Sequence, residues 1–458
     1  MAQTLRKNNV ASILLYNPIS GHGHLDGWMA MFAAILPTCG YTVYCLTPDT
    51  EALLLRLRQK GMEQHPGITI LPWQVSFNKF SPSYPLTQWR HFKELVYYLS
   101  NTYGNRLEGS RITSDMPFLR RCKKRLLQLL IRRPMRLSTP PDKEDDYFSP
   151  EDLGRRVKNA LKILPTNRYF LFNMYMDMYR TDKASWKKFS KHCALPWTGI
   201  RFVPEPEPRE AYYALSTLRG MCFMDEMRSH AYSAALPGKH FANLPDIADA
   251  SLPDDPPPAV QTIVGRAAGR KVVFMGGSID GRKNINQWYK LIRQADPQRF
   301  FFAQIGEIHY GTCTQEEQNI LHELSSVPPE NFFMIDKYLT DERDFNACIA
   351  ASDVIFAVYK NFRISSNMLG KAAAFEKPIL VSDLYLMGEN VRHYGLGAAV
   401  PEDDPVVILA ALERLIQTPP APENYAAYNI AHNEEALGQA LEEFFTACLH
   451  KRTENNLT

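Results

Sequence analysis

The stretch AASDVIFAVYKNFRISSNMLGKAAAFEKPILVSDLYLMGENVRHYGLGAAVPEDDPVVILAALERLI, residues 350–416, decides the fold of this chain. It opens with a short apolar segment at 354–358, passes through a polar loop, and enters a helical stretch with small residues on one face. A second apolar segment follows at 378–381. Short apolar runs that alternate with helical stretches are typical of buried parallel strands, because such strands need long, usually helical, crossover connections. This part of the chain is therefore predicted to be a doubly wound α/β domain.

The same alternation extends beyond this stretch. Three further predicted strands of the same domain lie upstream, at 271–275, 300–305 and 332–335. The proline-rich run 252–258 (LPDDPPP) is incompatible with a central strand or a helix interior, so it predicts a stiff linker. The first half of the chain has a strand and helix alternation of its own. Its predicted strands are at 13–16, 41–46, 68–71, 169–172, 199–203 and 220–224.

We therefore predict an α/β protein of two Rossmann-like doubly wound domains that face a cleft. The first domain spans residues 1–250 and carries an irregular insert at about 73–165, and the second spans 251–430. The C-terminal helical segment, 431–458, is predicted to cross back to the first domain. In such sheets ligands bind beyond the carboxyl ends of the strands, on loops that lead into helix N-termini.

Composition excludes several classes of protein. The 458 residues include 52 Lys and Arg against 49 Asp and Glu, and 45% are hydrophobic, which excludes a disordered or collagen-like chain. So small a net charge gives no argument for nucleic acid, and no such partner is predicted. Neither the eight cysteines nor the histidines cluster at ligand spacing, so no metal site is predicted. We recognise no signal peptide and no transmembrane run, and predict a cytoplasmic location.

The first candidate loop is Gly21-His22-Gly23-His24, which follows the strand at 13–16. Its glycines let the backbone approach a ligand, and its imidazoles stand at the mouth of a helix. It is a candidate floor for a phosphate or sugar, with His24 or His22 as polar contact or proton acceptor. We take His24 as a candidate catalytic residue, and Gly21, His22, Gly23 and the more distant Asp177 as acceptor-side candidates. A tight turn with solvated histidines is the alternative.

The second candidate loop, GGSIDGRKN at 276–284, follows a strand and opens a helix. It is neither a dinucleotide fingerprint nor a P-loop. A glycine-rich turn followed by Arg-Lys suits a diphosphate, because backbone N–H groups and a lysine together offset two negative charges. Gly277, Ser278 and Lys283 are the candidate diphosphate-binding residues here. A solvated turn between strand and helix is the alternative.

The third candidate loop leads from the strand at 354–358 into the small-residue helix. Ser365 or Ser366 is a good N-cap, and the N–H groups behind it form an anion site beside Arg363. An ordinary capped helix with a surface arginine is the alternative. Two anion-suited loops in one domain favour a binding site.

The order of motifs in residues 350–416 resembles the nucleotide-sugar domain of the GT-B glycosyltransferases, specifically the retaining family-four group. The matching order is an A-D-V-like strand, an active-site loop, a small-residue helix, a K-P strand, a G-E-x-V-like helix and a final helix after V-P-x-D-D-P. The segment VVFMGGSIDGRKN at 272–284 resembles the donor-phosphate loop of that family. In the first domain, Gly21 and Gly23 match its glycine-rich acceptor loop loosely.

The resemblance implies roles for individual residues. Lys283 falls on the phosphate-binding lysine of the family and Glu389 on the glutamate after the following strand, while Ser278 stands where the family has an arginine. The paired glutamates of the family, spaced Glu-x7-Glu, fall on Arg363 and Lys371, so basic residues replace both carboxylates. Arg363 is thus a candidate catalytic residue that would hold phosphate directly. Lys371, with Ser365 and Ser366, is assigned to donor binding.

The resemblance also implies an activity. The chain would be a hexosyltransferase-type enzyme that moves a sugar from a nucleoside-diphosphate donor to a glycan or lipid-linked acceptor. It would act with retention and without a metal or cofactor, in surface polysaccharide or glycolipid synthesis. Because both glutamates are replaced, a non-catalytic GT-B protein that binds or scaffolds is the alternative.

One basic stretch of the insert, within residues 117–136, alternates leucines with clusters of Arg and Lys at 120–133. A basic amphipathic helix of this kind suits an anionic membrane surface, so peripheral membrane contact at the inner face is an expectation. A core-packed helix with a solvated basic face is the alternative.

Overall fold

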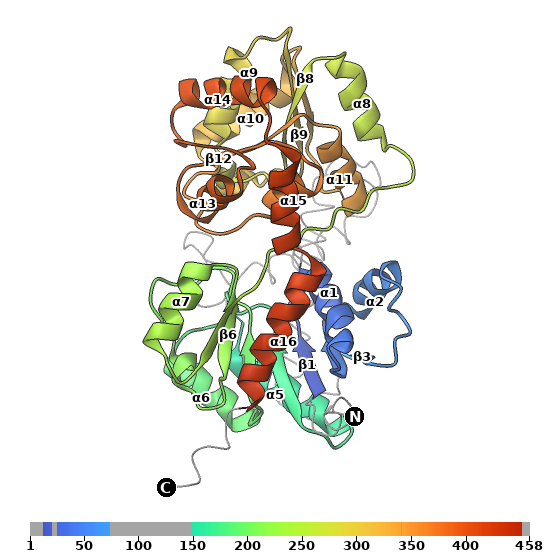
Figure 1. Ribbon diagram of the computed structural model, residues 1–458, viewed down its shortest axis with the longest axis vertical. Coiled ribbons are helices and arrows are strands. Elements are labelled where there is room, and N and C mark those ends of the chain that lie inside the picture. Colours follow the sequence, from blue (N-terminus) through green and yellow to red (C-terminus); the bar gives the residue numbers. More distant parts are fainter. Residues whose placement is uncertain (1–11, 21–24, 74–147, 340, 451–458) are drawn as a thin grey trace, which may run out of the picture.

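The computed structural model describes residues 12–20, 25–73, 148–339 and 341–450, which form two lobes (Figure 1). Each lobe is centred on a parallel β-sheet that helices cover on both faces. The predicted fold class, an α/β protein with two Rossmann-like domains, is confirmed.

The N-terminal lobe is built on a five-stranded sheet in the order β3-β2-β1-β4-β5. Its strands are β1 (Ser12–Tyr16), β2 (Val43–Leu46), β3 (Ile68–Leu71), β4 (Tyr169–Asn173) and β5 (Trp197–Gly199). Single bridges, such as that from Ile200 to Cys222, continue the sheet toward the pair β6 (Gly220–Phe223) and β7 (His240–Asn243). The helices of this lobe are α1 (Leu25–Thr38), α2 (Thr50–Gln59), α5 (Pro150–Ile163), α6 (Lys183–His192) and α7 (Glu226–Ala235).

Helix α5 corrects the prediction of an irregular insert at 73–165. Ser149 caps this helix, accepting the backbone N–H of Asp152 at 3.4 Å, and Pro150 occupies its first turn. Leu153 and Val157 lie one turn apart and are buried beside α6 in the core of the lobe. The prediction is wrong for residues 150–163, where the helix signals follow directly on a polar stretch of sequence and were not recognised. Residues 74–147, with the basic stretch 120–133, lie outside the described residues.

The C-terminal lobe holds a six-stranded parallel sheet in the order β10-β9-β8-β11-β12-β13. Its strands are β8 (Lys271–Gly276), β9 (Phe300–Ile305), β10 (Phe332–Ile335), β11 (Val354–Ala357), β12 (Ile379–Ser382) and β13 (Gly397–Val400). Its helices are α8 (Pro258–Ala267), α9 (Ile285–Gln294), α10 (Gln315–Ser326), α11 (Glu342–Ala350), α12 (Asn367–Ala374), α13 (Tyr385–Tyr394) and α14 (Pro405–Gln417). Helix α8 begins at Pro258, so the last proline of the predicted linker opens a helix, a position that suits its fixed φ and missing N–H.

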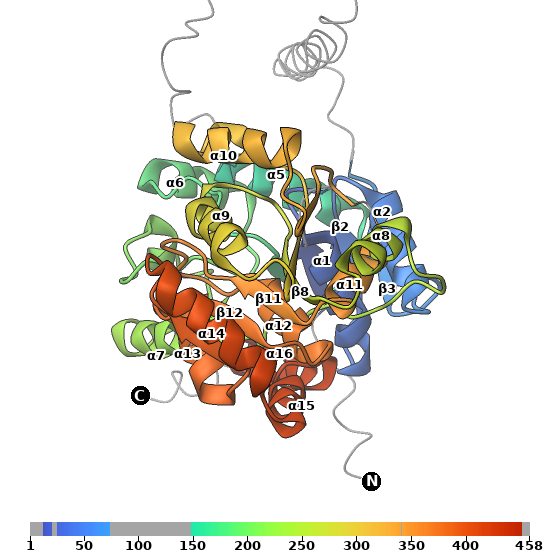
Figure 2. The same cartoon turned by 90° about the horizontal axis from the view of Figure 1, so that it is seen from above.

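The core of the C-terminal lobe has two halves, one on each face of the sheet. Successive residues of a strand point to opposite faces, so Val273 and Met275 join one apolar cluster while Val272 and Phe274 join the other. Seen from above, α8 and α11 lie on one side of the sheet and α9 and α14 on the other (Figure 2). Both faces are therefore closed to water, which leaves the strand ends as the exposed edge.

Two helices carry the chain from one lobe to the other. Helix α15 (Pro422–Ala431) packs on the C-terminal lobe, where Tyr425 and Tyr428 are buried. Helix α16 (Glu434–His450) runs along the N-terminal lobe (Figure 1) and buries Leu441 and Phe445 in the core behind β1 and β4. The last helix of the chain is thus part of the first lobe.

The junction between α15 and α16 contains a titratable group, His432. Its ring stacks on Tyr428 at a centroid distance of 3.9 Å, and its Nδ1 lies 3.0 Å from the Tyr428 carbonyl oxygen. Burial lowers the pKa of His432 below its ordinary 6.5. Between the lowered pKa and 6.5, the unfolded chain carries a proton on His432 and the folded chain does not, which favours unfolding. The packing of the neutral ring therefore stabilises the fold fully above pH 6.5, and this stabilisation is lost as the pH falls through the lowered pKa.

We expect the wild-type protein to lose more thermal stability between pH 7.5 and pH 5.5 than the variant His432→Phe, which keeps an aromatic ring but cannot be protonated. Differential scanning calorimetry at the two pH values measures this difference. Equal losses in the two proteins would show that His432 does not contribute to the acid sensitivity.

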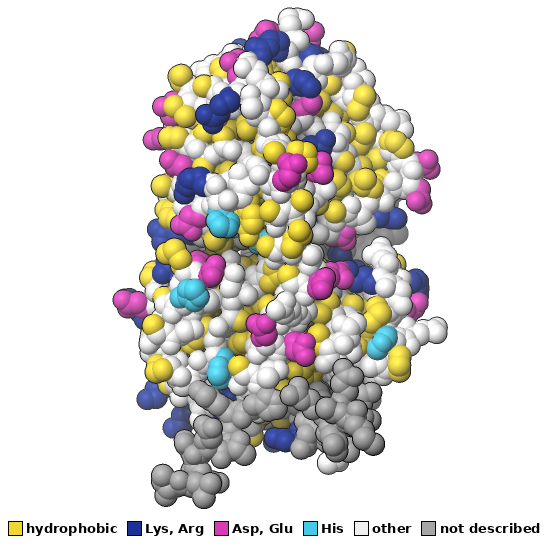
Figure 3. All heavy atoms as spheres, viewed as in Figure 1, with side chains coloured by type: hydrophobic (Ala, Val, Ile, Leu, Met, Phe, Trp, Pro, Cys, Tyr) yellow, Lys and Arg dark blue, Asp and Glu magenta, His cyan; other side chains and the backbone are white. Residues whose placement is uncertain are grey.

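The surface is mixed in charge. On the face shown in Figure 3, acidic and basic side chains are scattered over both lobes between apolar ones, in keeping with the small net charge of +3. Among the described residues, no helix has the length and apolar character needed to cross a membrane.

Candidate active site

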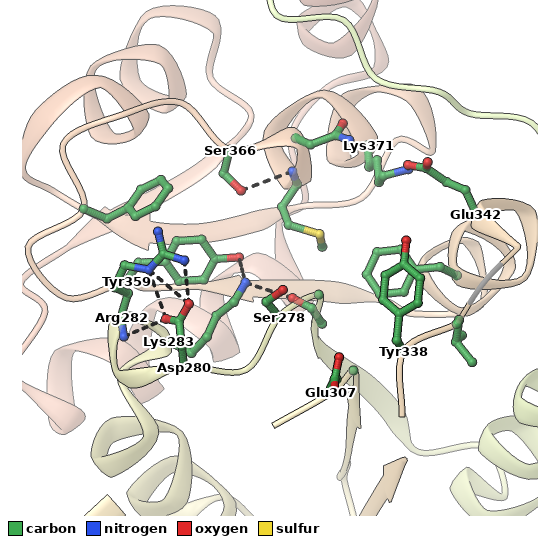
Figure 4. A pocket seen from close by; sticks show the side chains of 18 of the residues that line it. Ser278, Asp280, Arg282, Lys283, Glu307, Tyr338, Glu342, Tyr359, Ser366 and Lys371 are labelled. Atoms are coloured by element: carbon green, nitrogen blue, oxygen red, sulfur yellow. Dashed lines mark hydrogen bonds and ion pairs between the residues drawn. The ribbon is translucent and has the colours of Figure 1, made fainter. Parts of the chain in front are cut away.

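A pocket of about 330 Å³ opens at the carboxyl ends of β8, β9 and β11 (Figure 4). In the sheet, β9 lies on one side of β8 and β11 on the other, so the strand order reverses at β8. Such a switch point leaves a crevice between loops that run in opposite directions, and ligands of open α/β sheets bind there. All of the described residues that line the pocket belong to the C-terminal lobe.

The floor of the pocket is glycine backbone. Gly277 has a φ of +89° and Gly306 a φ of +148°, conformations that favour glycine. A Cβ on Gly306 would lie 1.9 Å from the carbonyl oxygen of Gly277, so only glycine fits where the two loops meet. A bound group can therefore come close to the main chain. The predicted residues Gly277 and Ser278 both line this part of the pocket.

Lys283 is the cation of this floor. Its side chain is buried, with 9% exposed, and its ammonium donates to the carbonyl oxygen of Gly276 at 2.9 Å and to the hydroxyl of Tyr359 at 2.8 Å. These bonds use two of the three N–H donors of a lysine. Among the described residues, its ammonium forms no ion pair with a carboxylate. A buried positive charge thus faces the pocket without a fixed counterion.

The neighbouring carboxylate, that of Asp280, forms an ion pair with Arg282. The guanidinium donates to it through Nε at 3.1 Å and through Nη2 at 2.5 Å. Burial works against the ionised carboxyl of Asp280, but the hydrogen bonds and charge of Arg282 outweigh it and lower the pKa of Asp280. These two charges largely cancel, which leaves Lys283 to set the sign of the potential at this end of the pocket.

The N-terminus of α12 forms the wall above the floor. Ser366 is its N-cap and accepts the backbone N–H of Met368 at 3.4 Å. Ser365 donates its hydroxyl to the carboxylate of Asp246 at 2.5 Å. Asp246 belongs to the connector (residues 244–257), the segment between β7 and α8. Both serines line the pocket as predicted, but Ser365 is held by the connector.

The opposite end of the pocket is lined by aromatic and charged side chains, among them Tyr338, Glu342 and Lys371 (Figure 4). Phe345 also lines the pocket, with its ring centre 5.9 Å from the Lys371 ammonium. Lys371 is buried, and its ammonium forms an ion pair with Glu342 at 2.9 Å. It also donates to the carbonyl oxygen of Asp249 at 3.0 Å and to the side-chain oxygen of Asn346. The sequence places Lys371 at the donor site, and the structure places it in the pocket wall, already bonded to the protein.

Two predicted residues do not line the pocket. Arg363 is exposed, and its guanidinium lies 5.4 Å from the centre of the Tyr385 ring at the start of α13. The chain turns through Asn361, whose φ is +51°, so that Phe362 instead of Arg363 faces the pocket. The sequence assigned Arg363 a phosphate contact, and the structure places its guanidinium outside the lining of this pocket. Glu389 is exposed on α13 and is likewise absent from the lining.

Among the acceptor-side candidates, Asp177 is the one that the structure describes, and it lies in the N-terminal lobe. Gly21, His22, Gly23 and His24 lie outside the described residues. Asp177 accepts the backbone N–H groups of Phe202 at 2.9 Å and Val203 at 2.7 Å. Burial raises the pKa of Asp177, although these two hydrogen bonds oppose the effect. Its carboxylate ties the loop after β4 to the loop after β5, a structural task that the sequence did not indicate.

A buried polar network lies beside the first candidate loop. The hydroxyl of Ser20 donates to the carboxylate of Asp26 at 2.9 Å and lies 2.8 Å from the hydroxyl of Thr47. The side-chain amide of Asn17 donates to the same carboxylate at 3.3 Å. These bonds link Ser20 and Asp26, which flank residues 21–24 in the sequence, to each other and to Thr47 and Asn17.

Sequence reasoning missed several pocket residues, among them Tyr359, Glu342 and Glu307. Tyr359 lies two residues after the end of β11 and within a candidate loop, so its position near a strand end was an available signal. Glu342 is the first residue of α11. In the sequence it resembles any acidic residue of a first helical turn, so nothing marked it as a pocket residue. Glu307 follows Gly306 at the end of β9, and its exposed side chain lines the pocket.

No protein-family model matches the sequence, and no curated protein matches it. Solved structures do match. A glycosyltransferase from Rickettsia africae ESF-5 is 11% identical with a TM-score of 0.58, covering 97% of this chain and 100% of that one. An alpha,alpha-trehalose-phosphate synthase (UDP-forming) from Burkholderia vietnamiensis is 12% identical with a TM-score of 0.54, covering 97% and 99%.

A sucrose-phosphate synthase from Thermosynechococcus elongatus is 10% identical with a TM-score of 0.54, covering 95% of this chain and 98% of that one. Nearly the whole length of each chain is superposed, across both lobes. The chain has the GT-B fold. In this GT-B chain the pocket lies in the C-terminal lobe, on the side of the sheet where the strands end.

Proposed function

We propose that this GT-B chain is a glycosyltransferase that binds a nucleoside-diphosphate sugar in the pocket of its C-terminal lobe. The observation that carries the proposal is Lys283, a buried ammonium at a glycine floor, with no carboxylate paired to it among the described residues. Burying an unpaired charge is costly, so the site is built for an anion. The N-terminus of α12, capped at Ser366, lines the same end and adds the positive end of a helix dipole.

A diphosphate leaving group fits this arrangement chemically. When the bond between the anomeric carbon and the β-phosphate oxygen breaks, negative charge develops on the departing diphosphate, and the acceptor oxygen forms the new bond. Fixed positive groups at that position stabilise the transition state more than the ground state. Lys283 and the N–H groups of α12 supply these without having to reorganise during the reaction.

The comparisons support the same ligand class. One structural neighbour, with a TM-score of 0.55 and 12% identity, is described as bound with UDP-2-fluoro glucose, and the trehalose-phosphate synthase neighbour is called UDP-forming. For this chain we carry over the class, a nucleoside-diphosphate sugar, and leave the base open.

The finer parts of the proposal rest on the resemblance of residues 350–416 to the retaining family-four group. They are transfer with retention, a hexosyl donor, no requirement for metal, and a glycan or lipid-linked acceptor in surface polysaccharide or glycolipid synthesis. A lipid-linked acceptor would agree with membrane contact through residues 117–136, which lie outside the described residues. The acceptor would enter from the N-terminal lobe, with His24 as the candidate proton acceptor.

A non-catalytic binding protein is the second candidate function. It is favoured by the basic residues Arg363 and Lys371, which stand where the resembling family carries two glutamates. Such a protein would retain the pocket and bind the nucleotide but would transfer no sugar.

Isothermal titration calorimetry with UDP and GDP, followed by a screen of sugar nucleotides for hydrolysis or transfer, tests both candidates. We expect one of the two nucleotides to bind, and one donor to be hydrolysed or transferred. Binding without turnover of any donor would favour the non-catalytic candidate. If neither UDP nor GDP nor inorganic pyrophosphate binds, the proposed function is wrong.

A further inference from the structure

The hydroxyl of Tyr359 lies at the same end of the pocket as the ammonium of Lys283, and the two groups are 2.8 Å apart. Only 2% of Tyr359 is exposed, so its ring is part of the core of the lobe. In Figure 4 the hydroxyl points from the ring toward the middle of the pocket and meets the ammonium there. Tyr359 therefore brings a polar group from the loop after β11 to the lysine of the loop after β8.

The direction of the hydrogen bond between these two groups follows from their chemistry. A lysine ammonium can only donate, whereas a tyrosine hydroxyl can both accept and donate. The oxygen of Tyr359 is therefore the acceptor, and its own proton is left for another partner. Among the described residues, none accepts a hydrogen bond from this hydroxyl. A buried donor that lacks an acceptor is costly, so this proton suits an acceptor atom of a ligand in the pocket.

The backbone and a neighbouring ring hold Tyr359 in place. Its N–H donates to the carbonyl oxygen of Ala357 at 2.8 Å, and the next N–H, that of Lys360, donates to the carbonyl oxygen of Arg282 at 2.8 Å. The ring packs edge-on against Phe362 at a centroid distance of 5.2 Å. A side chain that is already fixed loses little conformational freedom when it binds a ligand, so the hydroxyl is preorganised.

Lys283 makes this hydroxyl a stronger donor. Hydrogen bonds in a chain polarise one another, and here the charged N–H of the ammonium draws electrons from the oxygen of Tyr359. The ammonium keeps a third N–H of its own, because its bonds to Gly276 and Tyr359 use two. The pair thus offers one charged and one neutral donor at a spacing comparable to that of two oxygens on one phosphate group.

We propose that Tyr359 donates a hydrogen bond from its hydroxyl to the diphosphate of the sugar donor, beside Lys283, and stabilises the diphosphate as it departs. The O–H bond of Tyr359 is not broken. When the bond from the anomeric carbon to the diphosphate oxygen breaks, its electron pair stays on that oxygen, and the acceptor oxygen bonds to the carbon. This inference rests on the proposed function, because it needs a diphosphate in the pocket.

The variant Tyr359→Phe tests the proposal, because it removes the hydroxyl and keeps the ring. We expect it to bind inorganic pyrophosphate, and whichever of UDP and GDP binds the wild-type protein, at least about tenfold more weakly, the range of a hydrogen bond to a charged group. Isothermal titration calorimetry measures both affinities. The matched control is Tyr425→Phe, which removes a buried hydroxyl from α15 of the same lobe, outside the pocket lining, and should bind as the wild type does.

A second comparison separates direct contact from a supporting role. If Tyr359 only held Lys283 in place, its hydroxyl would have no effect once the ammonium is removed. In a Lys283→Met background we therefore expect Tyr359→Phe to weaken pyrophosphate binding by a further factor of at least about three, the range of a hydrogen bond without the polarising ammonium. Titration followed by phosphorus NMR measures these weaker affinities. No further loss in that background would overturn the direct contact.

The possible failures are distinguishable. If the wild-type protein binds pyrophosphate and a nucleotide, and Tyr359→Phe binds both equally well, this inference is wrong and the proposed function stands. If the wild-type protein binds neither the nucleotides nor pyrophosphate, the proposed function fails, and this inference fails with it.

Discussion

Replacing Lys283 with methionine is expected to weaken the binding of UDP or GDP by at least tenfold. The ammonium is buried, and its bonds to Gly276 and Tyr359 orient its charge toward the glycine floor. A hydrogen bond to a charged group contributes about 1.5–3 kcal/mol, and about 1.4 kcal/mol corresponds to a factor of ten in affinity. Methionine fills much of the same volume, so the change removes mainly the charge.

Calorimetric titration of the variant and the wild-type protein with the same nucleotide measures this effect. The matched control is Lys290→Met, which removes an exposed lysine from α9 and should leave the affinity unchanged. The weakening should be equal for inorganic pyrophosphate, because Lys283 lies at the phosphate end. An unchanged affinity of Lys283→Met for both ligands would remove the diphosphate from this part of the pocket.

Replacing Phe445 with alanine is expected to lower the free energy of unfolding of the N-terminal lobe by about 3–5 kcal/mol, the usual cost of truncating a buried aromatic residue. The ring of Phe445 is fully buried on α16. It lies 5.5 Å from the ring of Tyr41, 5.6 Å from that of Phe170 and 5.7 Å from that of Phe172. Its removal would leave a cavity between the last helix and the strands of the first lobe.

Urea unfolding followed by tryptophan fluorescence and circular dichroism measures this loss, and the transition that contains the N-terminal lobe should move to lower urea. Ile430→Ala, on the preceding helix, is the control, because that side chain is 72% exposed and surface substitutions usually change stability by less than about 0.5 kcal/mol. If Phe445→Ala shifted only the transition of the C-terminal lobe, the packing of α16 described here would be wrong.

Much of the architecture follows from local sequence patterns. The apolar runs at 271–275 and 354–358 became β8 and β11 with small changes at their ends, because a strand buried on both faces leaves a continuous apolar signal. The start of α5 was missed, even though Ser149 and Pro150 form an ordinary N-terminal signal. It follows a long polar stretch, and a single cap is a weaker signal than a run of strands.

The candidate site was predictable where strand ends and helix starts determine position. Gly277 and Lys283 follow β8, and Ser366 begins α12, so their place at one edge of the sheet follows from parallel topology. The position of Arg363 could not be read in this way, because the turn at Asn361 decides which side chain of the loop faces the pocket, and the lining includes Phe362. Side-chain direction in an irregular loop depends on packing, and Phe362 packs against Tyr359 there.

The sequence by itself determined two parallel α/β sheets, the order of their strands and helices along the chain, and a glycine-rich turn with a lysine at a strand end. These are local properties, set within one turn of helix or a few residues of strand. Only the tertiary structure decided that Lys371 is satisfied by Glu342, 29 residues earlier, and that Phe445 completes the core of the first lobe. Such partners are distant in sequence, and they meet because burying apolar surface brings separate elements together, which no local pattern records.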